Sequence, residues 1–135
     1  MPDIAGLDHI SLTVRDLDRS AAWYSELFGF TKVGQVPDDG QSGAKVLLYH
    51  PASKLVLGLS QHQRNPGEPF SEFRTGLDHI ALAAPGGRED LERWSQRLDE
   101  LGVKHSEIQP GVTGDLIVFR DPDNIQIEVY ASAAS

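Results

Sequence analysis

One five-residue segment occurs twice in this chain of 135 residues. Gly-Leu-Asp-His-Ile stands at residues 6–10 and again at residues 76–80, which places His9 and His79 seventy positions apart (79 − 9 = 70). Because five identical residues in order rarely recur by chance in a chain this short, the repeat indicates one structural unit used twice. Each half then carries a histidine at the same place.

The length of the chain suits one domain, and the repeat divides that domain into two similar parts. A half of the chain would bury too little apolar surface to be stable by itself. We therefore expect a single domain over residues 1–135, made of a module at 6–60 and a module at 76–131. The polar connector 61–75 is long enough to form a flexible arm or a lid.

Composition excludes several classes of function. The net charge of −8 repels phosphate backbones and argues against a nucleic-acid partner. The sequence contains no cysteine, which rules out disulfides and thiolate metal sites and fits a reducing compartment. No apolar run approaches the roughly 20 residues of a membrane span, and residues 1–4 lack signal-peptide features. We expect a cytoplasmic protein without membrane partners.

Hydrophobic periodicity predicts the same order of elements in both halves. After His9, apolar and polar residues alternate with the period of a strand, and apolar residues then recur at helical spacing up to Gly29. The first half reads as a strand at 7–14, a helix at 17–28 and strands at 32–36, 44–49 and 55–60. The second half reads as a strand at 79–83, a helix at 91–101 and strands at 104–109, 115–119 and 125–131. The prediction is an α+β fold of two β-α-β-β-β modules.

The last predicted strand carries a carboxylate on the face opposite its apolar residues. This residue, Glu128, has Gly58 as its partner in the first half (128 − 58 = 70), the same offset that relates His9 to His79. Two imidazoles and one carboxylate are ligands for a divalent metal, and three such ligands leave open positions of the kind found in catalytic sites. Gly58 would leave a fourth position vacant.

Structural explanations exist for each of these residues taken singly. A histidine in a strand is more often a structural residue than a ligand, Glu128 could face solvent, and packing alone could preserve the repeat. Their matched positions on the face away from the core favour the metal site. We interpret the remaining histidines, His50, His62 and His105, as surface residues, and Asp8 and Asp78 as residues that contact loops or helices.

Further residues are candidates for contact with a substrate. Ser11 and Tyr130 share the face of the predicted ligands and either touch substrate or merely line the site. Arg120 precedes the Asp121-Pro122 turn and is either a surface charge or a clamp for an anion. Gly58 borders the vacant position. The sequence identifies no proton-transfer residue.

From Leu7 to Tyr130 the chain resembles the vicinal oxygen chelate superfamily, which includes glyoxalase I, methylmalonyl-CoA epimerase, extradiol dioxygenases, fosfomycin thiol transferases and bleomycin-binding resistance proteins. The resemblance rests on the paired modules, the two histidines and the segment 119–124 leading to Glu128. It implies an eight-stranded cup in which a metal is chelated by a substrate with two neighbouring oxygens. It also implies that ligands come from His9, His79 and Glu128, and that a homodimer can build each site from two chains.

The chain departs from several branches of that superfamily. Glyoxalase I and the epimerase usually have a carboxylate or glutamine where Gly58 stands, which weakens the case for an isomerase. Extradiol dioxygenases usually have a tyrosine where this chain has Val118, and an upstream histidine that is absent between Ser106 and Asp121. The thiol transferases share the ligands and a hydroxyl at the position of Ser11. Bleomycin-binding members typically lack the ligands.

The sequence thus predicts an enzyme that uses one divalent metal ion (Fe, Mn, Zn or Ni) as a Lewis acid on a small molecule with vicinal oxygens. Whether it is a glyoxalase-like isomerase or lyase, a dioxygenase or a thiol transferase stays open. The alternative is a non-catalytic protein of the bleomycin-resistance type that sequesters an antibiotic or metabolite. We further predict that Gly58→Glu tightens metal binding and impairs any reaction that uses the vacant position.

Overall fold

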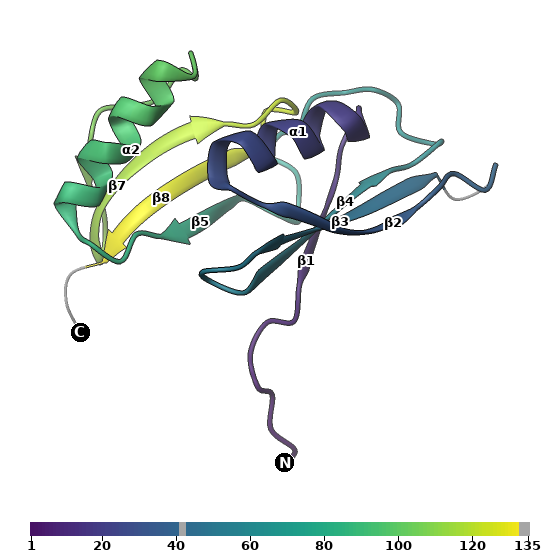
Figure 1. Ribbon diagram of the computed structural model, residues 1–135, viewed down its shortest axis with the longest axis horizontal. Coiled ribbons are helices and arrows are strands. Elements are labelled where there is room, and N and C mark those ends of the chain that lie inside the picture. Colours follow the sequence, from purple (N-terminus) through teal and green to yellow (C-terminus); the bar gives the residue numbers. More distant parts are fainter. Residues whose placement is uncertain (41–42, 133–135) are drawn as a thin grey trace. The chain divides into compact units, whose positions relative to one another are not determined.

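The computed structural model describes residues 1–40 and 43–132 of the chain. It divides into two compact units, unit 1 over Met1–Glu68 and unit 2 over Pro69–Ser135, and the boundary falls inside the connector. Each unit contains one four-stranded mixed sheet and one helix (Figure 1). The predicted α+β class and the β-α-β-β-β order of each half are confirmed.

Unit 1 contains β1 (Ile10–Thr13), α1 (Leu17–Phe28), β2 (Thr31–Val36), β3 (Ala44–His50) and β4 (Leu55–Gln61). The sheet order is β1-β4-β3-β2, with β1 parallel to β4. Asp16 begins α1 because its side chain accepts a hydrogen bond from the backbone N–H of Arg19. Gly29 ends α1 because it adopts the left-handed conformation (φ 79°) that a C-cap requires.

One face of this sheet forms the core of unit 1 together with α1. The helix buries Leu17, Tyr24 and Leu27, and it packs against β3 and β4. The strands contribute their alternate, apolar residues, which are Leu12, Val46, Leu48, Leu57 and Leu59. Because the other residues of these strands point away from the helix, Ser11 and Gly58 belong to the opposite face of the sheet, and His9 directly precedes β1.

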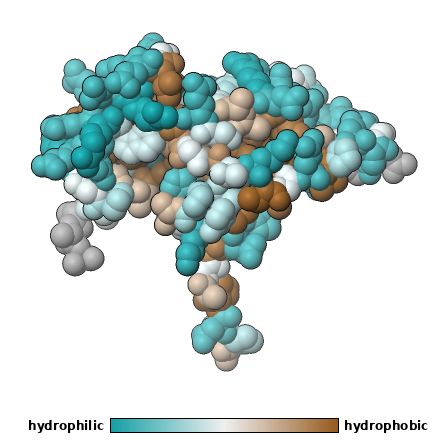
Figure 2. All heavy atoms as spheres, in the orientation of Figure 1, coloured by the Kyte–Doolittle hydropathy of each residue, from teal (hydrophilic) through white to brown (hydrophobic). Residues whose placement is uncertain are grey.

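Unit 2 repeats this arrangement with β5 (His79–Ala83), α2 (Arg88–Glu100), β6 (Gln109–Pro110), β7 (Gly114–Arg120) and β8 (Gln126–Ser132). The sheet order is β5-β8-β7-β6, and β5 is parallel to β8. Its core contains Leu91, Leu98, Ile117, Phe119, Ile127 and Val129. The outward face of α2 is hydrophilic (Figure 2). Among the described residues neither helix is long and apolar enough to cross a membrane.

The strand predicted at 104–109 is wrong over most of its length. Only Gln109 and Pro110 pair with β7, and His105 makes a single isolated bridge to Phe119. The ring of His105 instead contacts Asp99 at 2.7 Å and the carbonyl oxygen of Ser106 at 2.6 Å. These side-chain contacts hold the segment in an irregular conformation. The prediction of a surface imidazole is also wrong, because the His105 side chain is only 12% exposed.

Strand register relates the two units residue by residue. Ser11 pairs with Gly58 between β1 and β4, and Ala81 pairs with Glu128 between β5 and β8. Both members of the second pair lie seventy positions after their counterparts (81 − 11 = 70; 128 − 58 = 70). The two halves therefore share one backbone plan and differ in the residues on the face of the sheet that points away from the helix.

Candidate metal centre

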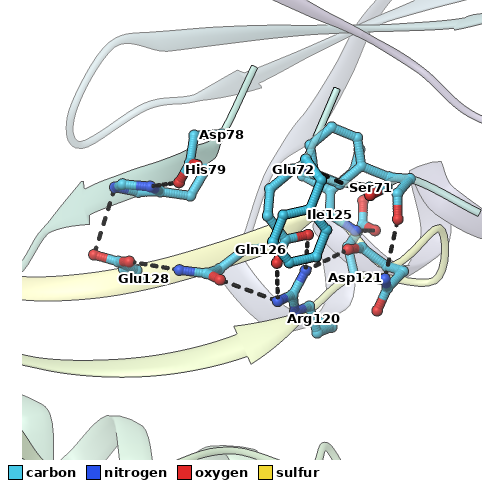
Figure 3. A network of polar contacts seen from close by, with 12 residues as sticks. Ser71, Glu72, Asp78, His79, Arg120, Asp121, Ile125, Gln126 and Glu128 are labelled. Atoms are coloured by element: carbon cyan, nitrogen blue, oxygen red, sulfur yellow. Dashed lines mark hydrogen bonds and ion pairs between the residues drawn. The ribbon is translucent and has the colours of Figure 1, made fainter. Parts of the chain in front are cut away.

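Unit 2 brings together two of the three predicted metal ligands. His79 at the start of β5 and Glu128 in the middle of β8 lie on the same face of the sheet, and the distance from His79 Nε2 to Glu128 Oε1 is 3.7 Å (Figure 3). Glu128 is buried, with 7% of its surface exposed. A buried carboxylate requires hydrogen bonds or a positive partner to offset the loss of solvation. The contact partners of these two residues therefore define the site.

Asp78 fixes which nitrogen of His79 is free. Its Oδ1 lies 2.6 Å from His79 Nδ1, and an ionised carboxylate can only accept, so Nδ1 carries the hydrogen. In the neutral imidazole Nε2 is then a bare lone pair that faces the carboxylate oxygen of Glu128. Two acceptors at this distance repel each other unless a proton or a cation lies between them. This is the arrangement in which metal-binding histidines are held by carboxylates.

The other oxygen of Glu128 has a defined partner. Gln126 Nε2 donates to Glu128 Oε2 at 2.8 Å, and Gln126 Oε1 accepts from Arg120 at 3.1 Å. Arg120 in turn contacts both carboxylate oxygens of Glu72, at 2.9 and 3.2 Å. Figure 3 shows the resulting chain of polar side chains from the connector to the face of the sheet. Glu128 Oε1 is left directed at His79.

His9 in unit 1 has the same local environment as His79. Its Nδ1 lies 2.7 Å from Asp8 Oδ1, so its Nε2 is likewise the nitrogen left for a further partner. His9 belongs to unit 1, whereas His79 and Glu128 belong to unit 2. Within residues 1–40 and 43–132 no three His, Cys, Asp or Glu side chains form a group able to hold a metal. The described residues therefore place no third side chain of this kind where it would complete a metal site with His79 and Glu128.

Ser11 and Gly58 lie next to each other in unit 1. A Cβ atom added to Gly58 would lie 2.4 Å from Ser11 Oγ, which is closer than atoms approach in proteins. Gly58 is buried and Ser11 is exposed. The glycine therefore makes room for the serine hydroxyl, at the register position where unit 2 has Glu128 beside Ala81.

Tyr130 lies on the ligand face of β8, beside an open hollow of about 320 Å³. The hollow is lined by Ala81, Leu82, Ala83, Thr113, Tyr130 and Ser132. The backbone N–H of Thr113 donates to the Tyr130 hydroxyl oxygen at 3.1 Å, and this bond lowers the pKa of Tyr130 because it favours the phenolate.

Both terminal nitrogens of Arg120 have hydrogen-bond partners within unit 2. Its two terminal nitrogens contact Glu72, Gln126 and the backbone oxygen of Asn124. Contact with Glu72 raises the pKa of Arg120 and lowers the pKa of Glu72 to about 2. An anionic substrate would have to displace one of these partners to reach the guanidinium group.

The second half of the connector is attached to the turn between β7 and β8. The backbone N–H of Phe70 donates to the carbonyl oxygen of Asp123, and the side-chain amide of Asn124 donates to the carbonyl oxygen of Phe70. Glu72 forms an ion pair with Arg120. The contacts of Glu72 and Gln126 with Arg120 were not predicted from the sequence. Asp8 and Asp78 were expected to contact loops or helices, whereas each contacts the histidine that follows it, and the repeated Asp-His dipeptide was a signal for these contacts.

Comparison with known proteins identifies the family to which the chain belongs. The sequence model of the Glyoxalase/Bleomycin resistance protein/Dioxygenase superfamily matches residues 6–129. The chain is 28% identical over 130 residues to fosfomycin resistance protein FosX of Listeria innocua, covering 95% of this chain and 90% of that protein. It is 28% identical over 130 residues to glutathione transferase FosA of Serratia marcescens (96% and 83% covered). It is also 28% identical over 128 residues to an ethylmalonyl-CoA/methylmalonyl-CoA epimerase of Cereibacter sphaeroides (88% and 90% covered).

Solved structures share the fold. The crystal structure of a glyoxylase/bleomycin resistance protein/dioxygenase domain from Frankia sp. EAN1pec matches with a TM-score of 0.87 and 30% identity, over 97% of this chain and all of that one. A variant of FosX from Listeria monocytogenes, in complex with Mn(II) and 1S,2S-dihydroxypropylphosphonic acid, matches with a TM-score of 0.71 and 24% identity over 97% and 95% of the two chains. At that identity the second match concerns the fold alone.

Proposed function

The chain belongs to the Glyoxalase/Bleomycin resistance protein/Dioxygenase superfamily, and we propose that it is a divalent-metal-dependent enzyme acting on a small molecule with vicinal oxygens. His9, His79 and Glu128 would hold the ion. Fe, Mn, Zn and Ni all accept two imidazoles and a carboxylate. The bound ion supplies Lewis-acid chemistry, by chelating two substrate oxygens and stabilising negative charge on them.

The observation that carries this proposal is the pair of acceptors facing each other in unit 2. His79 Nε2 and Glu128 Oε1 are 3.7 Å apart, and Asp78 holds the proton of the ring on its far nitrogen. Two atoms bound to one ion at about 2.1 Å with angles of 90–110° are about 3.0–3.4 Å apart. A small rotation of the exposed imidazole brings the pair to that separation without moving β8.

The third ligand has to come from unit 1, of the same chain or of a second copy in a homodimer. A mixing experiment distinguishes the two sources. Equal amounts of the His9→Ala and Glu128→Ala variants are unfolded together and refolded, and bound Mn(II) is measured. If the site is built from two chains, mixed dimers regain one intact site, whereas a site within one chain stays defective in every combination.

The ligand face offers groups to hold a substrate beside the ion. Gly58 provides no ligand at the register position that Glu128 occupies in unit 2, so a coordination position would be open to a substrate oxygen. Tyr130, whose hydroxyl oxygen accepts a hydrogen bond from the backbone N–H of Thr113, borders the hollow and would contact a substrate there. Arg120 would contact an anionic group only by exchanging a present partner. The relatives named above act on different molecules, so fosfomycin with and without a thiol, methylmalonyl-CoA and a catechol form the first substrate panel.

A binding protein that sequesters a metabolite or antibiotic is the second candidate. It is favoured by the hollow of about 320 Å³, whose lining includes Ala81 and Ala83. A ligand could occupy this hollow without a metal ion. The two candidates differ in what happens to the ligand. A sequestering protein binds it unchanged, without added metal.

Metal analysis of the purified protein tests the proposal. We expect one divalent ion per site in the protein reconstituted with Mn(II), and its loss in the His79→Ala and Glu128→Gln variants. His62→Ala is the matched control, because His62 is an exposed histidine outside the site. A protein that takes up no Mn(II), Zn(II), Fe(II) or Ni(II), yet binds members of the substrate panel, refutes the metal-dependent enzyme and supports sequestration.

A further inference from the structure

The polar chain that supports Glu128 occurs in only one of the two units. By strand pairing, Arg120, Gln126 and Glu128 of unit 2 correspond to Tyr49, Val56 and Gly58 of unit 1, residues that make no such chain. The backbone plan of the module therefore does not need these polar side chains. They are present in the unit that has a carboxylate, Glu128, on the face of the sheet away from its helix.

The chain fixes the orientation of a side-chain amide. Both ends of a glutamine amide look alike in shape, and only the surrounding donors and acceptors decide which end faces which neighbour. Arg120 can only donate, so it holds Gln126 Oε1 at 3.1 Å and turns Gln126 Nε2 toward Glu128 Oε2. Gln126 thus engages one oxygen of Glu128, and the other oxygen, Oε1, lies on the side of His79.

Glu72 fixes the position of Arg120 in turn. Its carboxylate contacts both terminal nitrogens of the guanidinium group, a geometry that sets the plane as well as the position of the arginine. The pair is partly sheltered, with 22% of the Glu72 side chain and 37% of the Arg120 side chain exposed. Because the pKa of Glu72 is held at about 2, chiefly by its hydrogen bond to Arg120, the pair stays ionised at any ordinary working pH.

We propose that Glu72 is a positioning residue for the metal centre: through Arg120 and Gln126 it holds Glu128 as a one-oxygen ligand directed at His79. The connector segment around Glu72 is then part of the site rather than a simple linker. This inference rests on the proposed metal-binding function. It also predicts that the three supporting residues act in series.

If the three residues act in series, a second substitution in the series has no further effect once the first has interrupted it. A general loss of stability would not produce this result. Isothermal titration with Mn(II) alone is carried out on the wild type, Glu72→Gln, Gln126→Leu and the double variant, and urea unfolding of the metal-free proteins is measured in parallel. Outer partners of ligands typically contribute 10- to 100-fold to affinity, so we expect Gln126→Leu to raise the Kd about 10-fold or more and Glu72→Gln to raise it about 3-fold or more. In the Gln126→Leu background, Glu72→Gln should change the Kd no further.

The matched control is Asp115→Asn. Asp115 pairs with Arg88 at 3.2 Å in the same unit, so this variant removes a comparable ion pair outside the chain that leads to Glu128. We expect its Kd to equal that of the wild type. The inference is overturned if wild type binds Mn(II) but Glu72→Gln leaves the Kd unchanged, or if the effects of Glu72→Gln and Gln126→Leu add. A wild type that binds no Mn(II) overturns the proposed function and this inference together.

Discussion

Gly58 provides a prediction whose size can be worked out from the structure. A Cβ atom at this position would lie 2.4 Å from Ser11 Oγ, 3.3 Å from Ser11 Cβ and 3.5 Å from Leu47 Cδ2. Only the first distance is prohibitive, and the obstructing atom is a hydroxyl that can rotate. The backbone does not require glycine, since Gly58 has no positive φ. The cost of Gly58→Ala should therefore come from displacing one hydroxyl group.

Two opposing terms set the magnitude. Forcing the Ser11 side chain about 30° away from a staggered rotamer costs about 0.5–1.5 kcal/mol, and replacing glycine within a strand gains about 0.5–1 kcal/mol. We expect Gly58→Ala to lower the free energy of unfolding by up to about 1 kcal/mol in the wild type and to raise it by about 0.5 kcal/mol when Ser11 is alanine. The coupling between the two changes is then about 0.5–1.5 kcal/mol, the cost of displacing the Ser11 hydroxyl.

Urea unfolding of the wild type, the two single variants and the double variant measures this coupling directly. Ser11→Ala alone is the control, because it removes the hydroxyl without adding the Cβ atom. A coupling within the roughly 0.3–0.5 kcal/mol expected of independent sites would refute the close approach of these two residues.

The same contact determines how Gly58→Glu should be made. In unit 2 the corresponding glutamate stands beside Ala81, so the change has a structural precedent only together with Ser11→Ala. We expect the Ser11→Ala, Gly58→Glu protein to bind Mn(II) more tightly than Ser11→Ala alone and to lose any activity that needs the vacant position. Unchanged affinity and turnover would show that Gly58 is remote from the metal.

Three further predictions concern single residues. Burial opposes protonation of His105, but its contacts with Asp99 and the Ser106 carbonyl outweigh this effect and raise the pKa of His105. The stabilisation from these contacts is therefore full below about pH 6.5 and is lost as the pH rises through the folded-state pKa. Asp99→Asn should destabilise the protein toward urea at pH 5.5 but far less at pH 9, and an equal loss at both pH values would contradict this. Gly29→Ala should lower the free energy of unfolding by about 1 kcal/mol. The loss would come from backbone strain at φ 79° and not from a clash, because nothing lies within 4 Å of an added Cβ atom. An unchanged melting temperature would count against the left-handed cap. Asp78→Asn should weaken Mn(II) binding about 10-fold with little change in unfolding, and a fall in stability at constant Kd would assign it a structural role instead.

Local signals made the first module predictable. The stop at Gly29 depends only on neighbouring residues, and the helix predicted at 17–28 is the one observed. The strand predicted at 104–109 failed because its conformation depends on His105, whose partner Asp99 lies in α2. Alternation of side chains along the sequence contains no information about that contact.

The candidate site could be predicted only for the residues that the repeat relates to each other. The offset of seventy residues identified His79 and Glu128 as candidates on one face, and the structure places them 3.7 Å apart. The supporting residues could not be found this way, because Glu72 and Arg120 are 48 positions apart and Glu72 lies in the connector outside the repeat. The family resemblance stated from the sequence is confirmed by the match over residues 6–129.

A crystal of the protein grown with Mn(II), with anomalous diffraction recorded to locate the ion, tests the central claim most directly. The account predicts one manganese peak within about 2.0–2.4 Å of His79 Nε2, of Glu128 Oε1 and of His9 Nε2 from the same or a second chain. Gln126 Nε2 should remain hydrogen-bonded to the other oxygen of Glu128. Manganese bound elsewhere, or a His79–Glu128 pair without manganese in a crystal saturated with the ion, would contradict it.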